Sequence, residues 1–270
     1  MRRTVVINHG EGGVDFGGWS VGPRQTLPVP RWFTLPREQV PAICEVVEQD
    51  WEEEPPAEGP LTFTWPEGWG EASGLYVLAA WGGTRRGAMA EYGLDPSFYL
   101  RVHLAHLATL RHDCAVLVVD NRTPEPVPAY EQFLAALPAG VALLRRPNRG
   151  MSYGAWSEAY GLFRSRFSHY VVVEDDYLPG LDDFDLILRE LLEKKRVGYL
   201  GSHYHRGPNL PHLGASSGIM KQAAMEAVWC RYGRLPHSDG ASYGRCKQEG
   251  QVSQSRAFLS VGWGIADQII

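Results

Sequence analysis

The sequence predicts an α/β protein with a mostly parallel β-sheet that is covered by helices on both faces. Two observations support this fold class. Between residues 74 and 200, short runs that are apolar throughout alternate with longer segments in which apolar residues recur every three to four positions. Strands that are apolar throughout are typical of parallel sheets buried between two helical layers. The chain of 270 residues, 44% of them hydrophobic, suffices for one large domain with an extension.

The expected elements follow one another in a regular order from Gly74. The predicted strands lie at 75–81, 114–121, 141–148, 169–176 and 197–204. The predicted helices lie at 96–112, 129–137, 152–167 and 182–195. The first helix opens at Pro96, a residue favoured at the first helical position because its missing N–H would have no partner there. Ligands bind beyond the carboxyl ends of parallel strands, so we expect a site at segments 81–86, 120–121, 148–150 and 174–176.

Residues 1–73 differ from the rest of the chain in being rich in Gly, Pro and Trp. Such residues interrupt regular elements, and only one short helix, at 38–49, is predicted there. We expect an extension packed on the main domain, with a separate lobe or flap as the alternative. The predicted domain organisation is therefore an extension at 1–73 and a main domain at 74–270.

Composition and charge exclude several classes of protein. The net charge of −5 gives no support for nucleic-acid binding through the field of the whole chain. Cys44, Cys114, Cys230 and Cys246 form no CxxC pair, so neither a zinc ribbon nor a disulfide framework is indicated, and we expect reduced thiols. No window approaches 18 apolar residues, and the first residues lack a signal-peptide pattern. A cytoplasmic protein without a membrane span is expected.

Three acids, Glu174, Asp175 and Asp176, directly follow the apolar strand at 169–173. Three adjacent carboxylates raise one another's pKa values unless a cation or several N–H donors compensate. Mg²⁺ and Mn²⁺ prefer oxygen ligands and commonly take one or two carboxylates together with phosphate oxygens of a substrate. In an extended segment Glu174 and Asp176 share one face and Asp175 points to the other. The acids therefore predict a site for a metal-bound diphosphate.

A second acidic group, Asp182, Asp183 and Asp185, has a simpler explanation. It stands where the helix at 182–195 begins, and Asp is favoured at helix N-caps. Apolar residues at helical spacing follow it. We therefore expect these three acids to belong to the start of a helix, with a role as metal ligands the less favoured alternative.

Three segments together resemble a known family. "VLVVDN" at 116–121, "RRPNRGMSYGAWSEAYGLF" at 145–163 and "HYVVVEDDYLPGLDDF" at 169–184 are similar to the nucleotide-sugar-binding half of GT-A glycosyltransferases, especially the inverting family 2 type. The resemblance covers about residues 75–263. It implies a GT-A fold, with a donor-binding half at 74–180 and an acceptor and catalytic half at 181–270. It also implies a nucleotide-diphosphate sugar as donor and Mn²⁺ or Mg²⁺ as cofactor.

The resemblance assigns a role to each matching residue on the donor side. The family's Asp at the end of the second strand contacts the nucleoside, its N-x-G loop lines the donor pocket, and its D-x-D-like motif binds the metal. Asp120 would thus contact the base or ribose, Glu174 the ribose or a metal-bound water, and Asp176 the metal directly. The other donor-binding candidates that the resemblance implies are Asn148 and Gly150 in the loop, Asp175 in the acidic motif, and Ser216, Ser217 and Gly218 in a turn that closes over the sugar.

The end of the first strand departs from the family. "AAWGGTRRG" replaces the usual threonine-tyrosine-asparagine-like turn. Trp81 is a candidate for stacking on the nucleobase, and Arg85 or Arg86 for contacting the diphosphate, because guanidinium groups suit phosphate oxygens. A Trp packed at the edge of the core and solvated arginines are the alternative interpretation.

The catalytic base is expected in the second half. "KQEGQVSQSRAFLSVGW" at 247–263 resembles the family's E-D-x-x-L-x-x-R segment, with Glu249 at the acid, Arg256 at the arginine and Gly250 in place of the second acid. An inverting transfer needs one carboxylate to accept the proton of the acceptor hydroxyl. Glu249 is the first candidate and Asp239 the second, and an ordinary surface acid is the alternative for either.

A group of histidines, His203, His205, His212 and His237, follows in the same half. An H-x-H pair in a strand can bind a transition metal, and polar lining of a cleft is the more frequent role. Both interpretations stay open from the sequence.

The predicted function is that of a glycosyltransferase, a hexosyltransferase-type enzyme of class EC 2.4. Two alternatives remain: a sugar-1-phosphate nucleotidylyltransferase, of which "WGGTRRGAM" is a faint match to the glycine-rich loop, and a non-catalytic GT-A-like binding protein, consistent with Gly250. The acceptor stays open among a glycan, a protein side chain, a small molecule and a modified base in nucleic acid.

Overall fold

The structure is a computed structural model of the whole chain. It describes residues 2–11, 14–16, 19–21, 26–28, 42, 44–50, 62–64, 66, 69–83, 93, 95, 97–122, 127–205, 212–214, 217–239 and 247–268.

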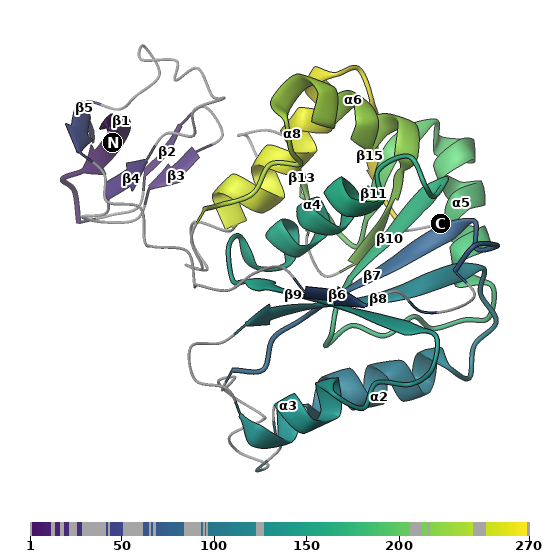
Figure 1. The fold of residues 1–270 in the computed structure, drawn as a ribbon. Helices are drawn as coiled ribbons and strands as arrows, with labels where there is room; N and C mark the ends of the chain where they lie inside the picture. Colours follow the sequence, from purple (N-terminus) through teal and green to yellow (C-terminus); the bar gives the residue numbers. More distant parts are fainter. Residues whose placement is uncertain are drawn as a thin grey trace.

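An eight-stranded mixed sheet forms the centre of the molecule (Figure 1). Its order is β15 (Gly264–Asp267), β11 (Val197–Gly201), β14 (Ser217–Lys221), β10 (His169–Glu174), β7 (Gly74–Ala80), β8 (Cys114–Arg122), β9 (Val141–Pro147) and β6 (Thr62–Thr64). Strands β10, β7, β8 and β9 are parallel neighbours, whereas β14 and β6 run antiparallel to the strands beside them. The expected mostly parallel sheet is confirmed.

Helices cover both faces of this sheet, as the apolar strands predict. One face carries α2 (Phe98–Leu107), α3 (Pro128–Leu134) and α5 (Phe184–Lys195), and the other carries α4 (Met151–Phe163), α6 (Gln222–Tyr232) and α8 (Ser253–Ser260). Alternate residues of β7 enter the two layers: Leu75 and Val77 pack under α4, and Tyr76 and Leu78 pack on the opposite side. The predicted α/β class is thus confirmed. None of the described helices is long and apolar enough to cross a membrane.

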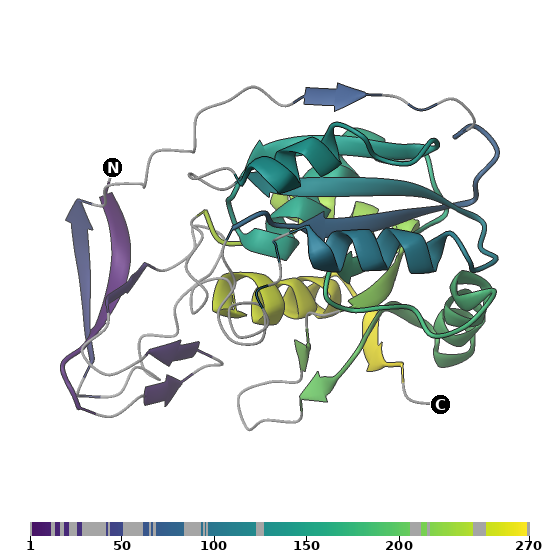
Figure 2. The same ribbon diagram turned by 90° about the horizontal axis from the view of Figure 1, so that it is seen from below.

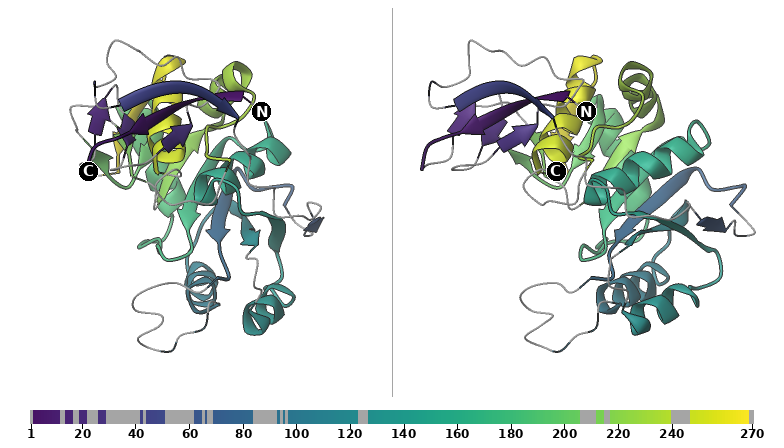
Figure 3. Two further views of the ribbon diagram at one scale, coloured as in Figure 1. Left: turned by 90° about the vertical axis from the view of Figure 1, so that its left-hand side faces the viewer. Right: turned by 60° about the vertical axis from the view of Figure 1, so that its left-hand side comes forward.

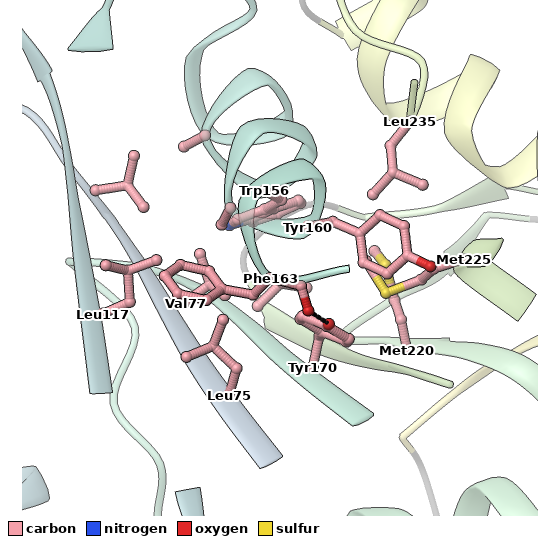
Figure 4. Close-up of a cluster of buried hydrophobic side chains, with 14 of the residues drawn as sticks. Leu75, Val77, Leu117, Trp156, Tyr160, Phe163, Tyr170, Met220, Met225 and Leu235 are labelled. Carbon is pink, nitrogen blue, oxygen red and sulfur yellow. Dashed lines mark hydrogen bonds between the residues drawn. The ribbon is translucent and has the colours of Figure 1, made fainter. Parts of the chain in front are cut away.

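The layer under α4 contains several large aromatic side chains among aliphatic ones. Figure 4 shows Trp156, Tyr160 and Phe163 of α4 above strand residues that include Tyr170. The Tyr170 hydroxyl donates to the Phe163 carbonyl oxygen over 2.6 Å, which satisfies its polar group inside an apolar layer. This packing fixes α4 on the sheet and thereby fixes the loop that precedes it.

Asp182 and Asp183 lie just before helix α5, as expected, but neither caps it through its side chain. Helix α5 begins at Phe184, and Asp183 occupies the N-cap position without a side-chain capping bond. Asp182 and Asp183 instead accept hydrogen bonds from Arg111, over 3.0 Å to its backbone N–H and 2.9 Å to its guanidinium. Asp183 has a positive φ of 55°, which is a left-handed backbone conformation and not the extended one that is typical of an N-cap. Its carboxylate pairs with the Arg111 guanidinium and does not cap the helix.

The first 73 residues contain strands where one helix was predicted. β1 (Arg2–Asn8) pairs with β4 (Thr26–Pro28) and with β5 (Cys44–Asp50), and β2 (Val14–Phe16) pairs with β3 (Trp19–Val21). Figure 3 shows β1 and β5 side by side. The predicted helix at 38–49 is wrong over 44–49, because pairing with β1 and the β-branched Val46 and Val47 favour a strand there. Residues 38–41 and 43 lie outside the described residues.

Residues 62–64, within the predicted extension, form β6 at the outer edge of the main sheet, beside β9 (Figure 2). The strands β1 to β5 belong to separate small sheets. The first part of the chain therefore contributes both to small sheets of its own and to the edge of the main sheet.

Candidate active site

The four strand ends that were expected to meet lie at one edge of the sheet. Ala80 of β7 is in register with Asp120 of β8, and Asp120 is in register with Arg145 of β9. Glu174 at the end of β10 is in register with Ala79. Since these strands are parallel neighbours, the segments that follow them surround one region of the molecule.

Glu174 is the last residue of β10 and is half-buried on the α4 face of the sheet. The hydroxyl of Ser152, in the first turn of α4, donates to its Oε1 over 2.5 Å. Tyr199 of β11 is close enough that the charge of Glu174 adds to the effect of burial, and both raise the pKa of Tyr199. Glu174 is therefore held by α4 and lies within electrostatic range of Tyr199.

Asp175 and Asp176 form a turn just beyond the strand. Asp175 is buried, its backbone N–H donates to the Ala79 carbonyl over 3.2 Å, and its carbonyl accepts from His103 Nδ1 over 3.3 Å. Asp176 is exposed. Because β10 ends at Glu174, the pleat alternation that paired Glu174 with Asp176 in the sequence does not extend to Asp176. The turn itself presents Asp176 to solvent and directs Asp175 inward.

His103 of α2, on the face of the sheet opposite α4, forms a hydrogen bond to the backbone of this acidic turn. Its Nδ1 donates to the Asp175 carbonyl, which can only accept, and its Nε2 lies 2.8 Å from the Tyr76 hydroxyl. In the neutral ring Nε2 then accepts from Tyr76. Burial lowers the pKa of His103 to about 4, although the hydrogen bond to Asp175 acts in the opposite direction. The turn that carries the acids therefore rests on a neutral, buried histidine.

We expect the fold to lose stability as pH falls from about 6.5 to about 4. The unfolded chain binds a proton at His103 in this window and the folded chain does not, so the contribution of the neutral ring is complete above pH 6.5 and is lost toward pH 4. The shift corresponds to roughly 3 kcal/mol. Urea unfolding of His103→Gln should show a weaker pH dependence than that of the parent chain. The matched variant of exposed His203, His203→Gln, should keep the parent slope, and equal slopes in all three proteins would contradict the assignment.

Asp120 is placed at the end of β8 as expected, but it is engaged by the protein. It is 1% exposed, its Oδ1 accepts from the Tyr130 hydroxyl over 3.0 Å, and its Oδ2 accepts from Arg145 Nε over 3.1 Å. Burial raises the pKa of Asp120, and the bonds from Tyr130 and Arg145 oppose that rise. The carboxylate thus joins β8 to α3 and β9, a role that its position in the sequence did not indicate.

The loop at 148–150 needs its glycine for two reasons. Gly150 has a φ of 70°, in the left-handed region that disfavours side chains. A Cβ there would also lie 2.7 Å from both the Ser238 carbonyl oxygen and His237 Nδ1. The loop therefore packs directly against 237–238. Asn148 Oδ1 is buried and makes no hydrogen bond within the described part of the chain.

Arg146, which the sequence did not single out, fixes this loop. It is 2% exposed, donates from Nη2 to the Arg149 carbonyl over 2.7 Å, donates from Nη1 to Asn121, and pairs with Glu158 of α4. A buried arginine that bridges two strand ends and a helix is a strong positioning element. Its partners are far apart in the sequence, so no local signal indicated it.

The two candidates for the catalytic base have different surroundings. Asp239 forms an ion pair with Arg234, over 2.8 Å, in the segment beside the Gly150 loop. Glu249 lies in a π-helical turn, η2 (Lys247–Val252), immediately before α8, and is 6% exposed. A Cβ on Gly250 would lie 2.5 Å from the Tyr153 ring of α4. The family's second acid would collide with Tyr153, which gives a packing reason for the glycine.

Helix α4 connects the two acidic elements. Ser152 at its start binds Glu174, and the next residue, Tyr153, packs against the turn that contains Glu249. The strand-end acid and the turn that contains Glu249 are therefore both in contact with the first turn of α4. This arrangement could not be read from the sequence, because the two acids are separated by a long stretch of chain and η2 packs on α4 only in the tertiary structure.

Several buried polar atoms around α4, β11, β14 and α8 make no hydrogen bond within the described residues. These atoms are Trp156 Nε1, Tyr199 Oη, Ser217 Oγ and both amide atoms of Gln254. An unsatisfied buried polar group costs about 1–3 kcal/mol, so such groups concentrate where a polar ligand or water binds. Sequence reasoning named only Ser217. The polar run 253–256, preceding the apolar Ala257 and Phe258, was the one available signal for Gln254.

Other predicted positions need correction or lie outside the described residues. Ser217 and Gly218 belong to strand β14 and not to a turn, because 217–221 forms the antiparallel strand between β10 and β11. Ser217 pairs with Val173, next to Glu174, whereas a Cβ on Gly218 would lie 2.5 Å from the Leu200 carbonyl oxygen inside the sheet. Ser216, Arg85 and Arg86 are not among the described residues.

Trp81 follows β7 and is half-buried, and a Cβ on Gly83 would collide with its ring. Gly82 is packed in the same way under Tyr130. The indole Nε1 of Trp81 is buried without a hydrogen bond in the described part of the chain. The glycines after β7 thus have a packing role. Trp81 retains one polar atom that a ligand can bind.

Among the histidines, the rings of His205 and His212 stack at 4.7 Å across the hairpin formed by β12 (Tyr204–His205) and β13 (His212–Leu213). His203 is exposed. Burial lowers the pKa of His237 to about 3, and its Nδ1 lies 2.7 Å from the Ser238 carbonyl oxygen. None of the four belongs to a converging group of three ligand side chains within the described residues.

The acidic turn suits a hard divalent cation by its donor type. Glu174 and Asp176 offer carboxylate oxygens, and the hydrogen bond from Ser152 orients one of them. Within the described residues, the acids of this turn do not belong to a converging set of three protein ligands. Mg²⁺ and Mn²⁺ commonly need only one or two carboxylates, with phosphate oxygens and water completing the shell. The residues present therefore fit a cation that binds together with a diphosphate.

Comparison with known proteins shows similarity at the level of the fold. No protein-family model matches the chain, and no curated protein does. A mannosyltransferase from Pyrobaculum calidifontis, solved with GDP-mannose and Mn²⁺, is 12% identical over 73% of this chain, with a TM-score of 0.48. The aligned part spans 55% of the length of that mannosyltransferase.

Two further solved structures are similar at lower scores. A cytidylyltransferase from Leptospira borgpetersenii is 13% identical over 74% of this chain and 76% of its own, with a TM-score of 0.43. A 4-diphosphocytidyl-2C-methyl-D-erythritol synthase from Anaerococcus prevotii is 8% identical over 73% and 88%, with a TM-score of 0.43. An α/β fold with a mixed, mostly parallel sheet supports many unrelated activities, so the fold of this chain does not by itself assign one.

Proposed function

We propose that this protein transfers a sugar from a nucleotide-diphosphate sugar to an acceptor hydroxyl, with a divalent cation and with inversion at the sugar. The observation that carries the proposal is the arrangement around α4. One turn of this helix positions both the strand-end acid Glu174, through Ser152, and the buried turn that contains Glu249, through Tyr153. A transferase of this kind needs one acidic group for the diphosphate and another for the acceptor.

On the donor side, Asp176 and Glu174 would hold Mn²⁺ or Mg²⁺. The cation, when bound, neutralises the charge that develops on the departing diphosphate. Ser152 fixes the orientation of Glu174, and His103 holds the turn that presents Asp176. Asn148 and Trp81, each with a buried polar atom at a strand end, would line the donor pocket.

On the acceptor side, Glu249 would accept the proton of the attacking hydroxyl. The hydroxyl oxygen forms a bond to the anomeric carbon as the bond from that carbon to the diphosphate oxygen breaks on the opposite face. The electron pair leaves with the diphosphate, and the proton remains on the Glu249 carboxylate. Tyr199, Gln254 and Trp156 offer both donors and acceptors nearby, which suits a hydroxyl-rich acceptor such as a glycan.

The alternative, nucleotidyl transfer from a nucleoside triphosphate to a sugar phosphate, uses the same fold and an acidic metal site. The glycine-rich segment after β7 was its main support. Gly82 and Gly83 have packing reasons of their own, under Tyr130 and Trp81, so they give no separate support for a phosphate-binding loop. Sugar transfer is therefore the preferred proposal.

A thermal-shift panel of nucleotide-diphosphate sugars, each with and without Mn²⁺, tests the proposal on the intact chain. We expect one donor to raise the melting temperature only when Mn²⁺ is present, and to be hydrolysed slowly in the absence of an acceptor. Formation of a nucleotide sugar from a nucleoside triphosphate and a sugar phosphate would establish the alternative. Donor binding without hydrolysis or transfer to any of a panel of glycans, peptides and small hydroxyl compounds would indicate a binding protein.

A further inference from the structure

Three side chains of metal-ligand type meet at the edge of the sheet opposite the acidic turn. Cys114 and His169 are the first residues of β8 and β10, and Asp185 lies in the first turn of α5. They are 8%, 2% and 0% exposed, and their ligand atoms all lie within 4.8 Å of one another. We propose that Cys114, His169 and Asp185 bind a transition-metal ion, with Zn²⁺ the best match, at a site separate from the acidic turn.

The sheet is adapted to bring the cysteine and the histidine together. Strand β7 runs between β8 and β10, and its first residue, Gly74, is in register with both Cys114 and His169. Strands two positions apart are separated by roughly 9.5 Å, so these side chains can meet only above a residue without a side chain. A Cβ on Gly74 would collide with the His169 ring and lie 2.9 Å from Cys114 Sγ. The glycine creates the space in which the two ligand atoms approach to 4.0 Å.

Hydrogen bonding outside the cluster sets the histidine in the tautomer that a metal requires. The Ser168 hydroxyl donates its one proton to the Ser73 carbonyl over 2.9 Å. Ser168 Oγ also lies 2.9 Å from His169 Nδ1, so in this contact Nδ1 must be the donor. Nε2, which faces Cys114, then carries the lone pair. Metal-bound histidines are typically oriented by such a hydrogen bond from the second ring nitrogen.

Asp185 is also oriented by a hydrogen bond from outside the cluster, and one of its two carboxylate oxygens makes no hydrogen bond within the described residues. Its Oδ2 accepts from the Asp113 backbone N–H over 3.0 Å and lies 3.8 Å from Cys114 Sγ. Its Oδ1 is buried and makes no hydrogen bond within the described residues. A fully buried carboxylate oxygen without a donor is unfavourable, and a cation between Asp185, Cys114 and His169 would satisfy it.

The surrounding charges favour a divalent ion. Asp113 and Arg189 are the other charged groups whose fields act on both Cys114 and His169. A Cys114 thiolate, Asp185 and Asp113 against Arg189 leave two negative charges, which one divalent cation balances. Tetrahedral zinc with bonds of about 2.0–2.3 Å places its ligand atoms roughly 3.3–3.8 Å apart. Cys114 Sγ lies 3.8 Å from Asp185 Oδ2 and 4.0 Å from His169 Nε2, and all three ligand atoms lie within 4.8 Å of one another, so the site contracts when it binds zinc.

An alternative role, a nucleophilic cysteine, does not fit this geometry. Burial and the neighbouring carboxylates raise the pKa of Cys114, whereas a reactive cysteine needs a lowered one. Asp185 also lies against the sulfur and not against His169 Nδ1, so it cannot orient the ring as the third member of a catalytic triad would. An ion can enter from a groove of about 510 Å³ whose lining includes His169, Arg189 and Lys221, and water from this groove can supply a fourth ligand.

The test uses Co²⁺ as a spectroscopic probe of the intact, chelator-treated chain. We expect one equivalent of Co²⁺ to give a thiolate-to-cobalt charge-transfer band together with the visible bands of a tetrahedral site, and Zn²⁺ to remove both. Cys114→Ser should lose the charge-transfer band. The matched variant of an exposed cysteine, Cys230→Ser, should keep it, and Asp176→Asn should keep it as well, which separates this site from the acidic turn.

Absence of the charge-transfer band in the parent chain, or its persistence in Cys114→Ser, would overturn the proposal. X-ray absorption at the zinc edge of the loaded parent chain gives an answer that needs no variant, in case Cys114→Ser does not fold. One sulfur at about 2.3 Å with nitrogen and oxygen neighbours at about 2.0–2.2 Å is expected. A coordination shell without sulfur would exclude Cys114 as a ligand.

Discussion

Replacing Asp176 by asparagine should abolish metal-dependent turnover of the nucleotide sugar and leave the fold intact. The exposed turn presents this carboxylate, and an amide removes the charge that holds the cation while keeping the shape of the side chain. Loss of a group that only orients a metal ligand costs about 10–100-fold in activity, so loss of the ligand itself should cost at least about 10²-fold. Initial rates of donor hydrolysis and transfer at saturating Mn²⁺ measure the effect.

The control for this substitution is Asp182→Asn. Asp182 is also exposed and lies between the same strand and α5. Its side chain has a structural contact, because it accepts a hydrogen bond from the Arg111 backbone N–H. It should retain parent activity. Both variants should keep the parent free energy of unfolding to within about 0.5 kcal/mol, which is the usual effect of a surface substitution. Full activity in Asp176→Asn would remove the metal assignment and with it the proposed donor site.

Replacing Glu249 by glutamine should lower sugar transfer by about 10²–10⁴-fold while donor binding stays unchanged, because a catalytic base contributes about that factor. The amide cannot accept the proton of the acceptor hydroxyl. The effect should appear in kcat, with a metal-dependent thermal shift by the donor equal to that of the parent chain. Steady-state kinetics with varied acceptor measure the loss of kcat, and the thermal shift measures donor binding. Together they distinguish a lost catalytic base from a damaged donor site.

Asp239→Asn is the matched comparison, since Asp239 was the second candidate for the base. Its carboxylate pairs with Arg234, over 2.8 Å, and this contact gives it a structural role in the segment beside the Gly150 loop. A modest loss, smaller than that of Glu249→Gln, is expected. The reverse order, with Asp239→Asn the more damaging, would transfer the role of base to Asp239.

Part of the candidate site was predictable because its signals are local. The segment 169–176 showed a buried strand followed at once by three acids, and the structure places Glu174, Asp175 and Asp176 at that strand end. What the sequence could not give was the partner of each group. Asp120 looked like a ligand-binding acid, but its oxygens contact Tyr130 and Arg145, and Arg145 comes from the neighbouring strand.

The wrong predictions have the same origin. Residues 44–49 have a pattern that suits a helix in isolation, yet β1 offers a pairing edge that turns them into a strand. Ser217 and Gly218 looked like a turn because Ser and Gly favour turns, but the space between β10 and β11 is filled by the antiparallel strand that contains them. Tertiary pairing outweighed local propensity in both segments.

The sequence by itself determined the α/β class, the four parallel strands and the position of the acidic turn, because apolar runs and the polar residues that end them are properties of neighbouring residues. Only the tertiary structure decided that α4 serves both Glu174 and the turn of Glu249, and that Cys114, His169 and Asp185 meet above Gly74. These contacts depend on strand order and helix packing, which join residues far apart in the chain and leave no periodic trace in its sequence.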